Sequence, residues 1–393
     1  MPTIKSPATY SILCVVGARP NFMKMAPIMA AFAALGPELD VCLVHTGQHY
    51  DVAMNHQYFE AHGIPQPDIN LDVGSGSHTA QTANVMLRFE SVLNTKYPSA
   101  VLVVGDVNST LACALVAVKK GIPVIHVEAG LRSFDRAMPE EINRVLTDQI
   151  SELLFITERS GCENLLREGI TEDRIRFVGN VMIDTLHHNL GNAVPVSKIL
   201  QNAGREEFLN GHDGYAILTA HRPSNVDDPD TLRSLLATIL KISARLPIIF
   251  PMHPRTRDMI QKFGLNTMLD VPTVLQLPPM GYLEMLGLMR DARVVLTDSG
   301  GIQEETTALG IPCITLRNNT ERPVTVHEGT NTIAGLDSAK ILTILDQIML
   351  NGGKAGRIPE FWDGQASTRI AAEVLDWLKN GLQSKQLLKP LQM

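Results

Sequence analysis

The chain has 393 residues, of which 45% are apolar and 19% charged, and its formal net charge is −7. This length exceeds what one hydrophobic core usually supports, so we expect two α/β domains rather than a coiled coil or a disordered chain. The negative charge argues against a nucleic-acid partner, and any anionic ligand must therefore be met by local cations.

The first half of the chain alternates short apolar runs with amphipathic stretches, which is typical of βα units that build a parallel sheet. The first run has strand length and lacks the basic flank and cleavage site of a signal peptide. No run approaches the roughly 20 apolar residues that span a bilayer, and the five cysteines include no Cys-x-x-Cys pair. We therefore expect a cytoplasmic protein without a membrane partner. The predicted strands are SILCVVG, VCLVHTG, AVLVVGD, PVIHVEAG, ELLFITE and RIRFVGN.

The alternation restarts after a weakly patterned stretch at 185–213. We therefore predict two doubly wound, Rossmann-like parallel-sheet domains, at 1–185 and 186–365, that face one another across a cleft. Ligands of such sheets bind at the carboxyl ends of the strands, which makes this cleft the expected site. We expect 366–393 to form a helix that packs back on the first domain. The predicted strands of the second half are YAILTAH, PIIFPMH, TVLQLP, RVVLTDSG and PCITLR.

Two cations follow the first predicted strand, in GARPNFMKMAP. Arg19 comes directly after the strand, and Lys24 falls in the first turn of the next helix. Cations are disfavoured beside the positive end of a helix dipole, so this pair indicates an anionic ligand. The alternative is that both are solvated surface charges. The segment is not a Gly-x-Gly-x-x-Gly loop, and none occurs elsewhere, which disfavours a dehydrogenase.

A glycine-rich turn in TDSGGIQEE follows a strand of the second half. Ser299, Gly300 and Gly301 would present free backbone N–H groups to a pyrophosphate at the start of a helix. Glu305, about one turn later, could accept hydrogen bonds from a ribose diol. Arg322 lies beyond the next strand and is a candidate phosphate contact. The alternative is an ordinary turn that Ser299 caps.

Acidic and imidazole side chains stand at the remaining strand ends. Glu128 directly follows the apolar VIHV, where a carboxylate would be costly unless it is paired or used. Asp106 could instead cap the helix that starts near Ser109. Glu140 opens a helix and has a structural alternative as a dipole partner, with Arg144 at i+4 as its ion-pair partner. The second half contributes His221 and Arg222, in TAHRPSN.

Taken together, seven motifs in this order resemble the motif set of the non-hydrolysing UDP-N-acetylglucosamine 2-epimerases. The resemblance covers about residues 10–375. It implies the GT-B architecture, with two Rossmann-like domains of which the second holds most of the nucleotide. The motifs are GARPNFMKMAP, GDVNSTLA, HVEAGLRS, MPEEINR, TAHRPSN, TDSGGIQEE and TERP.

The resemblance implies interconversion of UDP-N-acetylglucosamine and UDP-N-acetylmannosamine. UDP leaves as the proton on carbon 2 is removed, and it adds back to the 2-acetamidoglucal after a proton returns to the other face. No metal and no cofactor are implied, and a homodimer is expected. The resemblance implies that Asp106, Glu128, Glu140 and His221 are catalytic, that Arg19 and Lys24 contact the diphosphate and sugar, and that Arg222, Ser299, Gly300, Gly301, Glu305 and Arg322 contact the substrate. Which carboxylate serves which ring face stays open.

Three departures from the family pattern affect this interpretation. Pro223 and Tyr50 stand where many members have arginines, which puts allosteric activation by substrate in doubt. A typical aromatic near the base is replaced within Met280–Met285. The departures also suit a relative that acts on a modified sugar, such as UDP-2,3-diacetamido-glucuronic acid. The motifs are also compatible with a GT-B glycosyltransferase, a hydrolysing epimerase or an inactive sugar-nucleotide sensor, and the groups on carbons 3 and 6 of the sugar are not readable.

Overall fold

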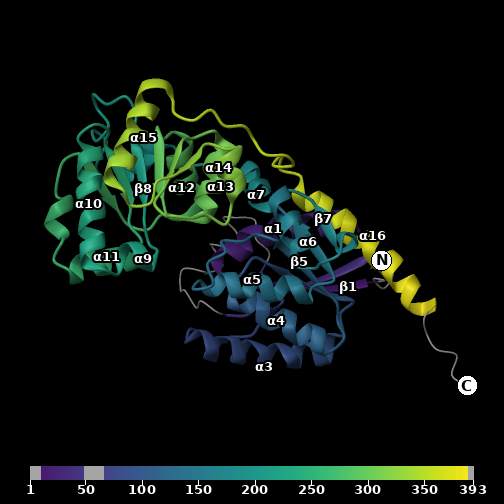
Figure 1. The fold of residues 1–393 in the computed structure, drawn as a ribbon. Helices are drawn as coiled ribbons and strands as arrows, with labels where there is room; N and C mark the ends of the chain where they lie inside the picture. Colours follow the sequence, from purple (N-terminus) through teal and green to yellow (C-terminus); the bar gives the residue numbers. More distant parts are fainter. Residues whose placement is uncertain (1–9, 48–65, 388–393) are drawn as a thin grey trace, which may run out of the picture. The chain divides into compact units, whose positions relative to one another are not determined.

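The structure is a computed structural model that describes residues 10–47 and 66–387. The chain divides into two compact units (Figure 1). Unit 1 comprises Met1–Thr185 and Glu360–Met393, and unit 2 comprises Leu186–Pro359. None of the described helices combines the length and the apolar character that a membrane span requires.

Unit 1 is built on a parallel sheet of seven strands, counted within the described residues, in the order β3-β2-β1-β4-β5-β6-β7. The central strands β4 and β5 are buried at every residue, as expected for a parallel sheet covered by helices. The strands are β1 (Tyr10–Val16), β2 (Leu39–His45), β3 (Ile69–Asn70), β4 (Ala100–Val104), β5 (Val124–Ala129), β6 (Leu153–Ile156) and β7 (Ile175–Phe177). The helices are α1 (Arg19–Ala34), α3 (His78–Lys96), α4 (Asn108–Lys119), α5 (Pro139–Ile150), α6 (Arg159–Arg167), the first part of α7 (Val181–Leu190) and α16 (Ala366–Leu387), with a 3₁₀ turn at Glu172–Arg174.

Unit 2 has a parallel sheet of six strands within the same described residues, in the order β10-β9-β8-β11-β12-β13. A single apolar cluster from β8, β9, β11, α10 and α15 forms much of its core. The strands are β8 (Ala216–Thr219), β9 (Ile248–Pro251), β10 (Val274–Leu277), β11 (Val294–Thr297), β12 (Cys313–Thr315) and β13 (Asn331–Ile333). The helices are α8 (Val196–Asn202), α9 (Pro223–Val226), α10 (Pro229–Ser243), α11 (Pro254–Lys262), α12 (Tyr282–Arg290), α13 (Gly300–Leu309), α14 (Pro323–His327) and α15 (Ser338–Asn351), with a 3₁₀ turn at Asn266–Leu269.

The strand order places a topological switch point in each sheet. It lies between β1 and β4 in unit 1 and between β8 and β11 in unit 2, because successive strands are added outward in opposite directions from these pairs. The helices that follow two such strands cover opposite faces of the sheet, which leaves a crevice at the carboxyl ends of the strands. The predicted doubly wound parallel fold is confirmed in both units. The short edge strands β3 and β13 were not predicted.

The chain returns to unit 1 before the last helix begins. Trp362 is buried, and its indole Nε1 donates to the Thr157 carbonyl at 3.1 Å. Helix α16 packs against α1, and the Asp184 carboxylate accepts from the backbone of Ala366 and Ser367 at its first turn. The return therefore starts at Glu360, a few residues before the expected boundary at 365.

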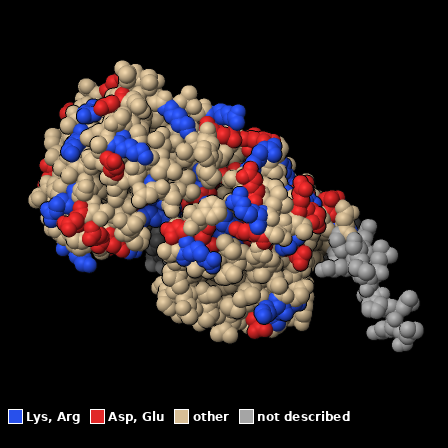
Figure 2. Space-filling view, viewed as in Figure 1, with Lys and Arg blue, Asp and Glu red and all other residues tan. Residues whose placement is uncertain are grey.

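Charged side chains of both signs are interspersed over most of the face shown in Figure 2. The lower part of that face, over α3 and α4, is mostly uncharged. Large apolar side chains are exposed on this helix layer of unit 1. They are Leu87 on α3, Val118 on α4, and Ile142 and Leu146 on α5, with 38–68% of each exposed.

Candidate active site

A buried ion pair stands at the switch point of unit 1. The Lys24 ammonium on α1 contacts the Glu128 carboxylate at the end of β5, and both residues are less than 10% exposed. Glu128 has a φ of 74°, in the left-handed region, and the strand register shifts between Val127 and Ala129. A non-glycine residue in this conformation is strained, and such strain collects at functional sites. The pairing with Lys24 compensates the buried charge that the sequence suggested at Glu128.

Gly105 makes the close approach of these groups possible. It follows β4 with a φ of 71°. A Cβ atom at this position would lie 3.3 Å from Glu128 Oε2 and from Asn21 Nδ2, and 3.5 Å from Lys24 Nζ. The ends of β4 and β5 therefore meet at a position where an added Cβ would crowd the ion pair.

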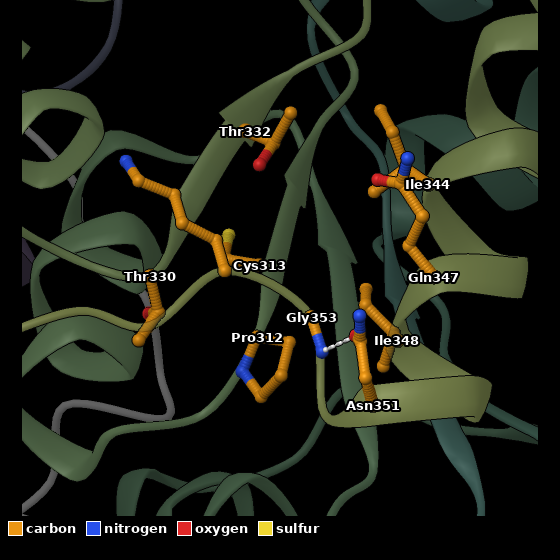
Figure 3. A pocket seen from close by; sticks show the side chains of 10 residues that line it. Pro312, Cys313, Thr330, Thr332, Ile344, Gln347, Ile348, Asn351 and Gly353 are labelled. Atoms are coloured by element: carbon orange, nitrogen blue, oxygen red, sulfur yellow. Dashed lines mark hydrogen bonds between the residues drawn. The ribbon is translucent and has the colours of Figure 1, made fainter.

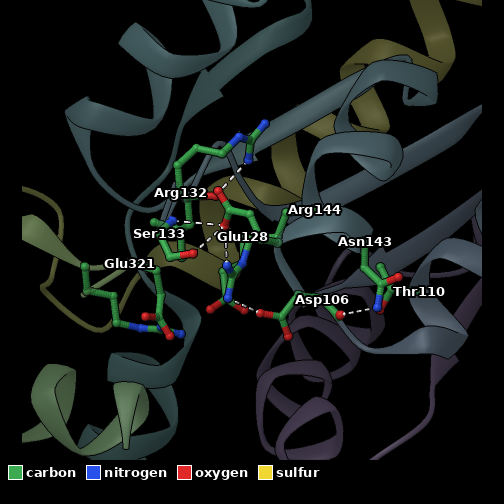
Figure 4. Close-up of polar contacts among 12 residues, drawn as sticks. Asp106, Thr110, Glu128, Arg132, Ser133, Asn143, Arg144 and Glu321 are labelled. Carbon is green, nitrogen blue, oxygen red and sulfur yellow. Dashed lines mark hydrogen bonds and ion pairs between the residues drawn. The ribbon is translucent and has the colours of Figure 1, made fainter. Parts of the chain in front are cut away.

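Asp106 is held by an arginine of α5 (Figure 4). Arg144 Nη2 contacts Asp106 Oδ2 at 2.5 Å, and Arg144 Nη1 contacts Glu141 Oε2 at 2.7 Å. Asn143 Nδ2 donates to the Asp106 carbonyl at 2.9 Å. The expected pairing of Arg144 with Glu140 is wrong, because the arginine side chain reaches Glu141 and crosses to the end of β4.

The alternative role of Asp106 as a helix cap is also wrong. Helix α4 starts at Asn108, and its N-cap residue is Val107. The Asp106 carboxylate therefore forms an ion pair with Arg144 and is partly exposed at the edge of the sheet.

Glu141 is a structural residue that the sequence interpretation missed. Its carboxylate accepts from Ser133 N, Ser133 Oγ and Phe134 N at 2.9–3.0 Å, and so fixes the loop between β5 and α5. Its neighbour Glu140 has no ion-pair or hydrogen-bond partner for its carboxylate among the residues that the structure describes, and it is partly exposed. Glu141 therefore anchors the loop, whereas the Glu140 carboxylate is available to a ligand.

A buried aspartate organises the switch point of unit 2. Asp298 Oδ2 accepts from the backbone N–H groups of His221 and Arg222 at 2.9 Å each and from Asn225 Nδ2 at 3.1 Å. His221 Nδ1 lies 3.1 Å from Asp298 Oδ1. Burial by itself raises the pKa of Asp298, but these hydrogen bonds and His221 outweigh it and leave the pKa lowered. The His221 ring is therefore oriented by a carboxylate, as in other acid–base sites.

Asp298 was not predicted from the sequence to be a site residue. The signal was present, because an aspartate directly after a buried strand is costly without partners. His253 stacks near His221, with ring centroids 5.1 Å apart. Burial, followed by the charge of His221, lowers the pKa of His253. Its Nδ1 accepts from Arg255 N at 3.2 Å, so His253 caps α11.

Three arginines surround one buried glutamate in unit 2. Arg322 Nη1 and Arg317 Nη2 each contact Glu321 at 2.9 Å, and Arg322 Nε contacts Glu304 at 2.8 Å. Arg222 Nη2 lies 3.8 Å from Glu321. Arg322, the predicted phosphate contact, is thus buried and forms ion pairs with two carboxylates. Arg222 is the most exposed of the three arginines.

The two glycines of the predicted turn differ in their surroundings. A Cβ on Gly300 would lie 2.5 Å from Arg322 Nη1, whereas a Cβ on Gly301 would meet nothing within 4 Å. Gly300 therefore makes room for the arginine, and Gly301 leaves the start of α13 open to a ligand. Ser299 is the N-cap residue of α13, but its side chain makes no capping hydrogen bond.

Glu305 is buried on α13. Burial raises its pKa to about 7, and the Tyr282 hydroxyl of α12 partly opposes that rise. Tyr282 is an aromatic within the Met280–Met285 segment, and Met280 and Met285 pack against an apolar cluster of unit 2. Pro223 is the first residue of α9, and Tyr50 lies outside the described residues.

A pocket of about 220 Å³ also occurs in unit 2, at the amino ends of β12 and β13 (Figure 3). Pro312, Cys313, Thr330 and Lys354 are among its lining residues. Lys354 Nζ donates to the Val326 carbonyl and lies 3.5 Å from the Asn331 carbonyl. The lysine thus ties the segment after α15 to the sheet, and the pocket contains no predicted site residue. Within the described ranges, no group of three or more His, Cys, Asp and Glu residues could hold a metal ion.

Two Rossmann-like units, one with carboxylates at its switch point and the other with a glycine turn, a histidine and arginines, define a nucleotide-sugar enzyme of the GT-B type. The UDP-N-acetylglucosamine 2-epimerase family model matches residues 34–375. The chain belongs to this family, and it is therefore an isomerase of the epimerase class.

Similar proteins cover nearly the whole chain. The chain is 42% identical over 364 residues to a UDP-N-acetylglucosamine 2-epimerase of Methanococcus maripaludis, which covers 92% of this chain and 97% of that protein. It is 40% identical over 372 residues to the UDP-2,3-diacetamido-2,3-dideoxy-D-glucuronate 2-epimerase of Pseudomonas aeruginosa, over 92% and 98% of the two chains. The crystal structure of Methanocaldococcus jannaschii UDP-GlcNAc 2-epimerase in complex with UDP-GlcNAc and UDP is similar, with a TM-score of 0.82 and 42% identity over 93% and 99% of the chains.

Proposed function

We propose that this protein interconverts UDP-N-acetylglucosamine and UDP-N-acetylmannosamine. The observation that carries the proposal is the buried Lys24–Glu128 pair, which faces the Gly105 turn one residue before Asp106. Removal of a carbon-bound proton needs a carboxylate at the site, and Glu128 is a buried carboxylate that an ion pair with Lys24 holds in place.

The proposed roles divide between the two units. Unit 2 binds UDP through Ser299, Gly300, Gly301, Glu305 and the arginines, and unit 1 supplies the carboxylates that move the proton. A carboxylate takes the proton from carbon 2, the electron pair of that bond forms a double bond to carbon 1, and the carbon–oxygen bond to UDP breaks. His221 assists the departing diphosphate, and Arg19 neutralises its charge. A second, protonated carboxyl group on the opposite face then gives its proton to carbon 2, the electron pair of the double bond forms the new carbon–hydrogen bond, and a UDP oxygen bonds to carbon 1.

The direct test follows the reaction by proton NMR in deuterated water with UDP-N-acetylglucosamine and no added cofactor. Deuterium at carbon 2 together with a UDP-N-acetylmannosamine signal is the expected result. Free N-acetylmannosamine and UDP would instead mean a hydrolysing enzyme. Absence of any exchange while UDP still binds would contradict the proposal.

A second candidate substrate is a UDP-2,3-diacetamido-2,3-dideoxyglucuronic acid. It is favoured by the 40% identity to the Pseudomonas aeruginosa enzyme, which is almost as high as that to the N-acetylglucosamine enzymes. The two candidates are separated by kcat/KM for both substrates under the same conditions. A preference of about 100-fold or more for the uronic acid would reassign the substrate.

We also propose a cytoplasmic role in supplying an activated sugar for polysaccharide biosynthesis. All five cysteines are free thiols, as is usual in a reducing compartment.

We further propose that the protein is a homodimer. The exposed apolar residues on α3, α4 and α5 support the dimer, since such patches mark interaction surfaces. A mostly uncharged face suits a two-fold contact, because it brings no like charges together when it meets a second copy of itself.

A further inference from the structure

A buried histidine of unit 1 lies on the same strand as Glu128, two residues before it. His126 is on β5, is 0% exposed, and has a hydrogen-bond partner for each ring nitrogen. Its Nδ1 lies 2.6 Å from Asp148 Oδ1, and its Nε2 lies 2.9 Å from the Gly105 carbonyl oxygen. The residues paired with it on β4 and β6 are the apolar Val103 and Leu154.

The two partners fix the protons of the ring. A carbonyl oxygen only accepts, so Nε2 must carry a proton. Asp148 also accepts from Gly130 N at 3.1 Å and contacts Arg132 Nη2 at 2.7 Å. Burial alone raises the pKa of Asp148, but His126 and Arg132 outweigh it and hold the pKa below its usual value. An ionised carboxylate only accepts, so Nδ1 must carry a proton as well, and an imidazole with both protons is a cation.

The charge balance of the cluster agrees with this assignment. Arg132 also makes two contacts to the Glu168 carboxylate, at 2.6 and 2.8 Å. With His126 charged, two cations face two carboxylates. With His126 neutral, the cluster would carry a net charge of −1, shared between the buried Asp148 and the Glu168 side chain, which is 26% exposed.

We infer that His126 is a buried imidazolium that acts as a positioning residue for the proton transfer proposed above. It ties the end of β4 to β5 at Gly105, one residue before Asp106, and it precedes Glu128 by two residues. The Gly105 N–H donates to the Val127 carbonyl at 3.1 Å, so the peptides on both sides of Gly105 are fixed by β5. Because Gly105 faces the Lys24–Glu128 pair, movement of this turn changes the geometry of the ion pair.

The charge state is tested on the wild-type protein at pH 7 by NMR of ¹⁵N-labelled imidazole rings. The His126 signals are assigned by their loss in a His126→Gln variant or by the slow solvent exchange of their buried protons. Both ring nitrogens are expected to be protonated. A neutral ring, with one protonated and one unprotonated nitrogen, would overturn the inference whether or not the protein is an epimerase.

The positioning role is tested by the kinetics of His126→Gln, with exposed His188→Gln as the matched control. The test of position rests on the proposed function, so it uses epimerisation and UDP binding separately. We expect kcat to fall about 10-fold to 100-fold, as for other residues that orient reacting groups, with KM and the UDP affinity within about twofold. An unchanged kcat in folded His126→Gln would refute the positioning role. A wild-type protein that binds no UDP and exchanges no proton would instead refute the proposed function.

Discussion

Glu128 combines a left-handed backbone, burial and an ion pair with a lysine. The sequence predicted that this carboxylate would be half buried and either paired or used, because it directly follows an apolar strand. It did not predict the partner. Lys24 lies far away along the chain, and the position in the first turn of a helix that the sequence predicted for it suggested an anionic ligand rather than a carboxylate of the protein itself. That position was wrong, because Lys24 is the sixth residue of α1 and lies in its second turn.

Glu128→Gln is expected to abolish epimerisation, because glutamine keeps the shape of the side chain and removes the base. A loss of at least about 100-fold in kcat is expected from the removal of a general base. The UDP affinity should stay within a few fold, since most of the proposed UDP contacts belong to unit 2 and Glu128 is not one of them. The measurement compares kcat and calorimetric UDP binding with those of Glu163→Gln, an exposed control on α6. Near wild-type turnover would remove Glu128 from the mechanism.

The UDP affinity is expected to rise as the pH increases through about 7, because burial raises the pKa of Glu305 to about 7 and the ionised carboxylate accepts more strongly, and at both oxygens, from a ribose diol. The effect of rising pH on folding stability has the opposite sign. The folded protein holds this proton more tightly than the unfolded chain, so the contribution of Glu305 to stability falls between its ordinary pKa of 4.5 and about 7.

Calorimetry of UDP binding between pH 6 and 8 measures this linkage through the release of a proton. The phosphates of UDP also titrate in this range, so Glu305→Gln is the reference. The wild-type protein should lose more affinity at pH 6 than the variant does. Parallel pH profiles of the two proteins would show that Glu305 does not titrate on binding.

At the scale of elements, the apolar runs predicted most strands, including the edge strands β7 and β10, whereas the edge strands β3 and β13 escaped detection. β3 has only two residues, and β13 has three with a polar Asn-Thr start, so neither forms an apolar run. The strand ends identified which side chains share an edge. They could not identify which side chains form ion pairs, because that depends on the path of the loops. Arg144, for example, reaches Asp106 only because α5 lies beside the end of β4.

The turn after β4 is expected to tolerate no side chain. Gly105→Ala should lose most of its activity, since the added Cβ meets Glu128 and Lys24. Gly121→Ala is the matched control, because Gly121 has the same φ of 71° and nothing within 4 Å of an added Cβ. Both variants should lose about 1 kcal/mol of folding stability from backbone strain, and only Gly105→Ala should lose turnover. Equal activities, measured alongside denaturant unfolding, would contradict the crowding at Gly105.

At the scale of the whole molecule, the helix layer of α3, α4 and α5 is the proposed contact with a second copy. Leu146→Glu should convert the dimer to a monomer, because a buried unpaired carboxylate on each copy is costly. Leu350→Glu on α15 of unit 2 is the control, since Leu350 is 86% exposed outside this layer. Light scattering after size exclusion measures both masses. A wild-type monomer, or a Leu146→Glu variant that stays dimeric, would contradict the proposed interface.

The return of the chain to unit 1 at Glu360 has a consequence for biosynthesis. Unit 2 is continuous in sequence, so all its residues have left the ribosome while unit 1 still lacks Trp362 and α16. The catalytic carboxylates are made first, but the unit that carries them is completed last. A nonsense codon after residue 359 would therefore leave every proposed UDP contact in the protein. It would remove α16, which packs against α1, so the truncated protein would lose part of unit 1 and keep all of unit 2.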